Sequence, residues 1–281
     1  MNIISMGDAK FFSTVLFSIF QAAKHYPDST FILYDWGFEP EQKKKLLQFP
    51  SVTLINWTDR LVEANRVFRR DKGIKHFLKA KVLRHPDVRR PLNEWQREFL
   101  LDEKCYCILD ACIRGEDSFL FLDADAFLVN RIDELISTRN DVMITLRPLH
   151  EIEEARKRGS RHDINSGVIF FNKDKIKTLT FIIEWIKEMN ILNLQRHPLS
   201  EQTALSNLVL RGNIDSYSEG KGDVDIPIGD LIVTCGIVST DTYNYNSIED
   251  GFDPEKNRIL HLKSGRYKNG YLKGVKEKLG Q

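Results

Sequence analysis

The amino-acid sequence predicts an α/β protein built on a parallel sheet with helical crossovers. Strand-like and helix-like segments alternate over residues 1–57, and this order is typical of parallel sheets. In mid-chain, the apolar run Phe119–Leu122 ends in two aspartates. The composition, 42% hydrophobic and 29% charged over 281 residues, is that of a globular chain that can bury a sizeable core.

The charge balance argues against one class of partner. Lys and Arg number 41 and Asp and Glu 40, a net charge of +1, so we expect no nucleic-acid binding through overall charge. The four cysteines contain no Cys-x-x-Cys pair, which favours reduced thiols over a zinc site. These are Cys105, Cys107, Cys112 and Cys235.

The first elements follow from hydrophobic periodicity. The apolar segment Phe11–Ala23 resembles the core of an export signal, but its polar residues fall at helical spacing and predict an amphipathic helix. The polar face holds Thr14, Ser18, Gln21 and His25, and the apolar face holds Phe12, Val15, Ile19 and Ala22. We expect strands at Asn2–Ser5, Thr30–Tyr34 and Val52–Ile55 and helices at Phe11–His25 and Glu41–Gln48.

Residues 58–113 are predicted to be mainly helical, and they include a basic stretch. Between Arg66 and Arg90 there are ten Lys or Arg residues and two acids, Asp71 and Asp87. Such a stretch is either a solvated helical surface or a patch that meets an anionic acceptor, a phosphate or membrane headgroups.

The most informative motif is the pair Asp123 and Asp125. Residues two apart in an extended chain point the same way, and ligands of open α/β sheets bind at the carboxyl ends of strands. Two close carboxylates favour a cation between them, and Mg²⁺ or Mn²⁺ binds one or two carboxylates together with substrate phosphates. Such pairs also form turns and helix caps, but the place directly after a buried strand favours the metal.

Further elements are expected along the second half of the chain. Strands are predicted at Asp141–Thr145, Ser166–Asn172 and Arg258–Leu262, and helices at Asp174–Met189 and Ser200–Leu210. At the start of one strand, Asn165 can hydrogen-bond sugar hydroxyls and Gly167 permits close approach, although a strand-entry turn also accounts for both.

Four segments together resemble a known family. FLFLDADAFLV resembles the metal-binding strand of GT-A nucleotide-sugar glycosyltransferases, especially glycosyltransferase family 8. Ile164–Asn172 is similar to the family's Asn-small-Gly strand, Glu201-Gln202 to its Asp-Gln pair, and Ile259–Leu262 to its late ligand-bearing strand. The openings SMGDAKFFSTVLFSI and FILYDWG also look like its nucleotide-contacting half, so the resemblance covers roughly residues 1–57 and 100–270.

The resemblance implies a single GT-A domain over residues 1–281 with a mixed, mainly parallel sheet between helices. Residues 1–130 would form the nucleotide-binding half and residues 131–281 the acceptor and catalytic half. The implied metal ligands are Asp123, Asp125 and His261, and the implied catalytic residues are Glu201, Gln202 and Asn165. The implied donor-binding residues are Met6, Gly7, Asp8, Asp35, Lys104, Asp123, Ser166, Gly167 and Lys268. One residue more than in the family pattern separates His261 from Gly265, so Lys263 or Arg266 could take the place of Lys268.

The implied activity is metal-dependent transfer of a hexose, with retention, from a nucleotide-diphosphate sugar to a hydroxyl. UDP is the expected nucleotide, Mn²⁺ or Mg²⁺ the metal, and a glycan or glycolipid the acceptor, as in polysaccharide biosynthesis. We expect a cytoplasmic protein, with residues 66–90 as a peripheral contact to the inner face of the membrane.

The sequence argues against three other enzyme classes. A phosphohydrolase of the HAD type would carry Thr or Val where this chain has Phe127, and a nucleotidylyltransferase would have a Gly-rich basic loop where this chain has SMGDAKFF. A dinucleotide dehydrogenase needs a GxGxxG motif, which this sequence does not contain. Two alternatives stay open. One is a non-catalytic nucleotide-sugar or glycan-binding protein on the same fold, and the other is an inverting enzyme with Asp163 or Glu201 as its base.

Overall fold

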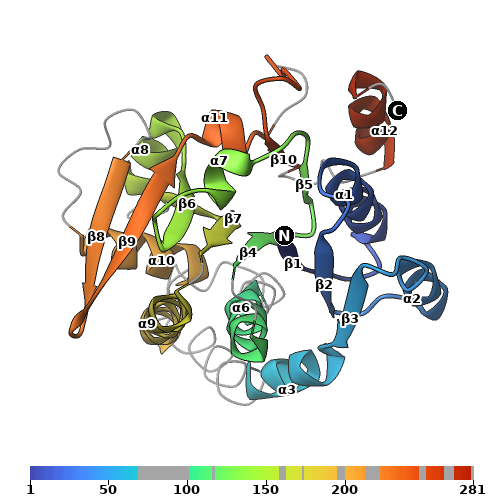
Figure 1. The fold of residues 1–281 in the computed structure, drawn as a ribbon. Coiled ribbons are helices and arrows are strands. Elements are labelled where there is room, and N and C mark those ends of the chain that lie inside the picture. The colour runs from blue at the N-terminus through green and yellow to red at the C-terminus, as the bar shows by residue number, and fades with distance from the viewer. Residues whose placement is uncertain are drawn as a thin grey trace.

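The structure is a computed structural model that describes residues 1–68, 101–115, 118–157, 163–172, 174–194, 200–212, 222–246, 251–262 and 269–279. The described chain forms an eight-stranded sheet, covered by helices, and a separate two-stranded sheet (Figure 1). The strands are β1 (Asn2–Gly7), β2 (Thr30–Asp35), β3 (Val52–Asn56), β4 (Phe119–Leu122), β5 (Ala126–Leu128), β6 (Val142–Leu146), β7 (Ile164–Phe171), β8 (Gly222–Ile228), β9 (Leu231–Val238) and β10 (Ile259–His261). The helices are α1 (Phe12–His25), α2 (Pro40–Leu46), α3 (Thr58–Phe68), α6 (Glu103–Arg114), α7 (Asp133–Ile136), α8 (Leu149–Lys157), α9 (Lys175–Leu194), α10 (Ser200–Leu210), α11 (Thr240–Tyr243) and α12 (Asn269–Lys278).

The large sheet is mixed. Its order is β3-β2-β1-β4-β7-β6-β9-β8, so the first and second halves of the chain meet where β4 pairs with β7. Strands β3, β2, β1 and β4 are parallel neighbours, as are β6 and β9. The pairings of β7 with β4 and β6, and of β8 with β9, are antiparallel. Because parallel pairings outnumber antiparallel ones, the predicted mixed, mainly parallel sheet is confirmed.

Helices cover both faces of this sheet because alternate strand residues point to opposite sides. On one face, Ile4, Phe119 and Phe121 pack in a cluster with side chains of α6, α9 and α10. On the other face, Ile3 and Leu120 belong to a second cluster with α1 and α7. All four residues of β4 are buried, which accounts for its continuous apolar run.

The two-stranded sheet adds a layer that the sequence did not predict. Strand β5 pairs antiparallel with β10, so that His261 lies opposite Ala126. Helix α1 lies between the large sheet and this layer, and Phe17 on α1 packs with Phe127 of β5 and Val275 of α12. The predicted helix is confirmed as α1, but its polar face is not exposed to solvent, because Thr14, Ser18 and Gln21 are as buried as Val15 and Ile19.

Strand β7 contains a wide irregularity beside the site. Ile144 of β6 pairs with Ile169, but the next residue, Thr145, pairs with Asn165, so residues 166–168 of β7 have no partner on β6. Strand β4 still pairs with Val168 on the other side. Such bulges redirect side chains, and this one pushes Ser166 and Gly167 toward the end of β4.

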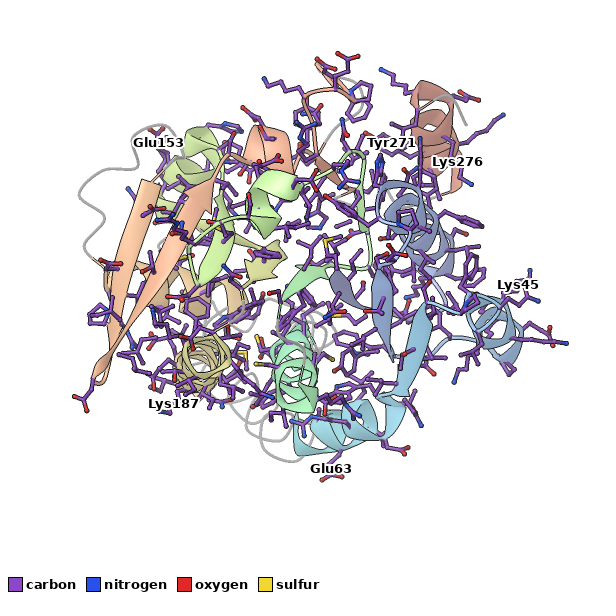
Figure 2. All side chains as sticks on the ribbon, viewed as in Figure 1. Lys45, Glu63, Glu153, Lys187, Tyr271 and Lys276 are labelled. Carbon is purple, nitrogen blue, oxygen red and sulfur yellow. The ribbon has the colours of Figure 1, made fainter. Side chains whose placement is uncertain are left out.

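The remaining elements surround this framework. The hairpin β8–β9 and helices α7, α8, α11 and α12 were not predicted; β8 alternates buried and exposed residues as an edge strand does. Figure 2 shows Lys45, Glu63, Glu153 and Lys187 at the rim of the molecule. All four cysteines are buried and unpaired. None of the helices in the described ranges has the length and apolarity to cross a membrane. Of the basic stretch 66–90, only the backbone of residues 66–68 belongs to the described part.

Candidate functional site

The end of β4 brings two carboxylates to the carboxyl edge of the sheet. A tight turn follows Leu122, in which the amide of Ala126 donates to the carbonyl of Asp123 at 2.9 Å. The chain then enters β5, and the amide of Leu262 donates to the carbonyl of Asp125 at 2.8 Å. Because β5 pairs with β10, His261 lies beside the two aspartates although it is distant from them in the sequence.

Asp123, Asp125 and His261 converge on one point. One ligand atom from each lies within 4.8 Å of the others. His261 Nε2 lies 3.1 Å from Asp125 Oδ1 and 3.7 Å from Asp123 Oδ2. Two carboxylates and one imidazole nitrogen form a donor set that suits Mg²⁺ or Mn²⁺. The residues that the resemblance implies as metal ligands are therefore together in space.

The orientation of the His261 ring supports this fit. Its Nδ1 lies 2.9 Å from Oδ1 of Asn244, which is fully buried. Because an amide oxygen only accepts, Nδ1 donates to it, and Nε2 is the ring nitrogen that faces Asp123 and Asp125. A neutral ring held in this way presents the Nε2 lone pair to the point where the carboxylates meet, which is the arrangement in which histidine binds a metal.

Gly167 lies directly behind these ligands. A Cβ atom at this position would clash with Cε1 of His261 and would lie 2.7 Å from Asp123 Oδ2. The backbone is also engaged, since the amide of Asp123 donates to the carbonyl of Gly167 at 2.8 Å. The sequence expectation was close approach of a ligand to Gly167, and in the structure the close neighbours are the candidate metal ligands themselves.

Lys104 links the aspartate pair to α10. It is only 3% exposed, and its ammonium lies 2.8 Å from Glu201 Oε1, 3.0 Å from Ser166 Oγ and 3.4 Å from Asp123 Oδ1. Burial alone lowers the pKa of Lys104, but the charges of Asp123 and Glu201 outweigh burial and hold the pKa above its ordinary value. Lys104 is thus a permanent cation that neutralises part of a carboxylate-rich site.

The beginning of α10 is anchored around this cation. The indole of Trp185 donates to the carbonyl of Glu201 at 2.8 Å. Ser200 Oγ bonds the carboxylate of Asp102, the residue before α6, at 3.2 Å, and Asn193 donates to the same carboxylate at 2.7 Å. Helices α6 and α10 are therefore fastened together at the ends that carry Lys104 and Glu201.

A cleft of about 250 Å³ opens in front of these groups. At the side of the cleft formed by α10, the guanidinium of Arg147 donates to Gln202 Oε1 at 2.7 Å and to Glu151 Oε2 at 3.0 Å. Asn165 is buried, its Oδ1 accepts from the amide of Gly167, and its Nδ2 has no hydrogen-bond partner among the described residues. The cleft is lined by Met6, Gly7, Asp8, Phe11, Trp36, Leu101, Asp123, Ala124, Asp125, Arg147, Asn165, Gln202 and His261.

Asp35, one of the predicted donor-binding residues, does not line this cleft. Asp35 ends β2 with its Oδ1 accepting the amides of Gly37 and Phe38, at 2.9 and 2.8 Å, and its Oδ2 paired with Lys43 at 2.5 Å. These contacts account for its burial as part of a turn. Lys268, like its alternatives Lys263 and Arg266, lies outside the described residues.

Several residues of the site were not predicted from the sequence, among them Arg147, Trp36 and Asn244. Arg147 directly follows β6, so its place at a strand end was an available signal. Trp36 follows β2 in the same way. Asn244 ends α11, a single turn of helix, and no local pattern distinguishes it from the neighbouring Asn246.

Comparison with known proteins identifies the fold. The sequence matches no protein-family model and no curated protein. A crystal structure of the galactosyltransferase LgtC in complex with donor and acceptor sugar analogues covers 100% of this chain and 94% of its own, with a TM-score of 0.55 and 12% identity. An active-site glutamine-to-glutamate mutant of LgtC gives a TM-score of 0.51 and 12% identity, over 100% of this chain and 95% of its own. The bifunctional glycosyltransferase WbbM gives 0.50 and 11% identity, over 94% of this chain and 46% of its own. The chain therefore has the fold of GT-A glycosyltransferases, and the fold class predicted from the sequence is confirmed.

Proposed function

We propose that this protein is a metal-dependent glycosyltransferase that moves a hexose from a UDP-sugar to a hydroxyl of a glycan or glycolipid. The observation that carries the proposal is the convergence of Asp123, Asp125 and His261 in a cleft, beside Gln202, at the carboxyl edge of a GT-A sheet. A carbohydrate- or nucleotide-binding protein would have little use for three converging metal ligands.

The proposed roles divide the cleft into three parts. When bound, Mn²⁺ or Mg²⁺ supplies Lewis-acid stabilisation of the negative charge that develops on the leaving diphosphate. Asp123, Asp125 and His261 would hold it. Met6, Gly7 and Asp8, with the aromatic rings of Phe11 and Trp36, would bind the nucleotide, because they line the part of the cleft formed by the ends of β1 and β2.

The sugar would lie between the metal ligands and α10. Asn165 Nδ2 has no other partner among the described residues and would donate to a sugar hydroxyl. Gln202 would present its amide NH₂ from the opposite wall, because Arg147 occupies its oxygen. Glu201 and Ser166, both bonded to Lys104, would fix that cation beside Asp123. Lys268, and Asp35 at the end of β2, stay predictions as donor contacts.

Retention of anomeric configuration is the proposed stereochemistry. An inverting enzyme needs a carboxylate base within reach of the acceptor hydroxyl. Asp163 is buried, pairs with Arg156 at 3.1 Å and does not line the cleft, and Glu201 is paired with Lys104. NMR of the product decides the point, since a β-linked product from an α-linked donor would contradict retention.

Two measurements test the activity. The first is thermal unfolding with UDP, GDP, CMP or dTDP, each with and without Mn²⁺; we expect Mn²⁺-dependent stabilisation by UDP, about 2.7 kcal/mol at a hundredfold excess over Kd. The second is turnover of UDP-sugars by Asp125→Asn, which removes charge at constant volume and should abolish transfer. Asp230→Asn, on the exposed β8–β9 turn, is the matched control and should keep full turnover.

The outcomes separate the alternatives. Stabilisation by a nucleotide without turnover of any UDP-sugar would favour the binding protein on the same fold. Wild-type turnover by Asp125→Asn would overturn the metal-dependent mechanism, and no response to any nucleotide would overturn the donor class.

We also propose that the protein works in the cytoplasm and that residues 66–90 contact the acceptor or anionic lipid at the inner face of the membrane. The basis is the excess of Lys and Arg in this stretch. Replacing Lys72, Lys75 and Lys79 with Gln should reduce cosedimentation with anionic vesicles and leave hydrolysis of the donor unchanged. Equal cosedimentation of variant and wild type would contradict the membrane contact.

A further inference from the structure

A buried chain of hydrogen bonds runs from the candidate metal ligand His261 to the large sheet. His261 Nδ1 donates to Asn244 Oδ1 at 2.9 Å, and Asn244 Nδ2 donates to Thr145 Oγ1 at 2.7 Å. Thr145 Oγ1 in turn donates to the carbonyl of Asn165 at 3.4 Å. Asn244 and Thr145 are 0% and 1% exposed, so water does not compete for these bonds.

We propose that Asn244 is a positioning residue that sets the tautomer and ring orientation of His261 for metal binding. The inference rests on the proposed function, because it assigns Asn244 a role toward the metal of that same site. Asn244 has no contact of its own with Asp123 or Asp125 in the described structure, and it acts through His261.

The three bonds form one consistent set of donors and acceptors. The hydroxyl of Thr145 donates to the carbonyl of Asn165 and accepts from the NH₂ of Asn244. The amide oxygen of Asn244 then faces the imidazole, and it can only accept. When the ring is neutral, His261 is therefore held with its proton on Nδ1 and its Nε2 lone pair toward the two aspartates, which is the form that binds a metal.

Backbone hydrogen bonds also hold Asn244 next to His261. On either side of its bond to the ring, the amide of Tyr245 donates to the carbonyl of Ile259 at 3.0 Å and the amide of His261 donates to the carbonyl of Tyr245 at 2.7 Å. The amide of Asn244 itself donates to the carbonyl of Thr240, which closes the single turn of α11. Asn244 therefore joins β10 of the small sheet to β6 of the large sheet through side-chain bonds.

This arrangement accounts for a fully buried amide at this position. A buried amide with unsatisfied groups is destabilising, whereas here both ends of the side chain have partners. Outer-shell partners of this kind typically change metal affinity 10–100-fold when they are removed.

The test measures metal binding directly. Mn²⁺ titrations followed by the EPR signal of free Mn²⁺, with the metal alone and with UDP present, would compare the wild type with Asn244→Leu, which keeps the volume and removes the acceptor. We expect about a 10–100-fold rise in Kd. Asn244→Asp keeps an acceptor oxygen in the same place and should bind Mn²⁺ almost as the wild type does.

Two further variants distinguish loss of the bond to His261 from a general loss of structure. Thr145→Val removes the two bonds of the Thr145 hydroxyl but keeps the bond between Asn244 and His261, so it should give a smaller rise in Kd with an intact fold. Asn207→Leu, at a partly buried amide of α10 that bonds Glu188 at 3.0 Å, is the matched control and should leave Kd unchanged. If Asn244→Leu does not fold, Asn244→Asp and Thr145→Val decide the question.

A spectroscopic measurement reports on the tautomer itself. In ¹⁵N–¹H correlation spectra of the metal-free protein, with the His261 signals assigned by His261→Gln, Nδ1 should be the protonated nitrogen in the wild type and in Asn244→Asp. In Asn244→Leu this preference should disappear.

The failures are distinguishable. A wild type that binds no Mn²⁺ in either arm would overturn the metal site and the role of Asn244 with it. A wild type that binds Mn²⁺ while a folded Asn244→Leu binds it equally well would overturn only the role of Asn244. Loss of binding in Asn244→Asp equal to that in Asn244→Leu would also overturn it, because the acceptor oxygen is retained there.

Discussion

Arg147 Nη2 lies 2.7 Å from Gln202 Oε1, and both residues line the candidate cleft. A guanidinium has no acceptor atom, so the amide oxygen of Gln202 must face Arg147 and the NH₂ group must face away from it. Charge-assisted bonds of this kind are short and strong, and Glu151 holds the other side of the guanidinium at 3.0 Å. Arg147 therefore determines which face of the Gln202 amide a substrate meets.

Removal of this guanidinium should reduce turnover more than donor binding. In Arg147→Met the Gln202 amide is free to rotate, and the loss of a charge-assisted bond, about 1.5–3 kcal/mol, corresponds to a fall in kcat of about 10–100-fold. Steady-state kinetics should show a smaller change in KM for the donor. Arg211→Met is the control, because Arg211 also bonds two acceptors, Glu184 and Glu188, outside the cleft. A kcat equal to that of the wild type would show that the orientation of Gln202 has no part in catalysis.

A methyl group at position 167 should disturb the metal ligands. The Cβ of Gly167→Ala would clash with His261 and press on Asp123 Oδ2, and overpacking of this kind costs about 1–3 kcal/mol of unfolding free energy. We expect weaker Mn²⁺ binding by EPR together with a lower midpoint in urea. Gly229→Ala, where an added Cβ meets nothing within 4 Å although φ is +58°, should leave Mn²⁺ binding unchanged. Wild-type affinity in Gly167→Ala would mean that the ligands can shift without loss.

The buried cation should be coupled energetically to its partner on α10. Lys104→Met leaves the carboxylates of Asp123 and Glu201 without their cation, and loss of one partner of a buried pair typically costs about 3–5 kcal/mol. In Lys104→Met/Glu201→Gln one of those charges is also removed, so the double variant should lose less stability than the sum of the single variants.

Chemical denaturation of the four members of this cycle measures the coupling. Lys273→Met is the matched control, since Lys273 and Glu277 are 79% and 65% exposed and 3.9 Å apart, and its effect should be within about 0.5 kcal/mol. Additive effects within the cycle would contradict the coupling.

Alkaline pH should weaken the junction between α1 and α7. Burial raises the pKa of Tyr26 to about 12, while its hydroxyl accepts from the amide of Ile132 at 2.6 Å and donates to Asp133 at 3.1 Å. Because the unfolded chain has the ordinary tyrosine pKa of about 10, the folded state holds the proton more tightly between these values. The unfolding free energy should therefore fall as pH rises from about 10 to 12.

Urea unfolding across this pH range measures the slope. Tyr26→Phe should show a shallower fall, with the remainder due to Tyr34 and Tyr243, whose pKa values are also raised by burial. An equal slope in wild type and Tyr26→Phe would contradict the contribution of Tyr26.

The elements that could be predicted are those whose sequence pattern depends on neighbouring residues alone. The run Phe119–Leu122 is apolar throughout because both faces of β4 are covered, and its bounds match those of the strand. The polar residues of α1 did not indicate which side of the helix is exposed, because Thr14 and Ser18 are buried by tertiary packing that no local pattern predicts. Strand β5 is three residues long and forms only where β10 arrives, so its own sequence does not indicate it.

The residues of the candidate site also differ in whether the sequence alone could predict them. Asp123, Asp125 and Gln202 belong to short motifs at the ends of regular elements, and such places can be read from a sequence. Asn244 acquires its role because α11, β10 and β6 meet around it, which depends on tertiary packing. Asp35 also ends a strand, but the left-handed turn at Gly37, with φ of 130°, brings backbone amides to its carboxylate, so strand position alone does not determine its role.

The pairing of β5 with β10 makes the metal site a product of late folding. His261 comes much later in the sequence than Asp123 and Asp125, so during synthesis the carboxylates emerge long before their third partner. Contacts between such distant segments form slowly, because a long loop must be closed first. An incomplete or truncated chain would therefore hold its two aspartates without the imidazole and would leave β5 as an unpaired edge. Formation of β10 is therefore required for assembly of the candidate metal site and, under the proposed function, for turnover of the donor.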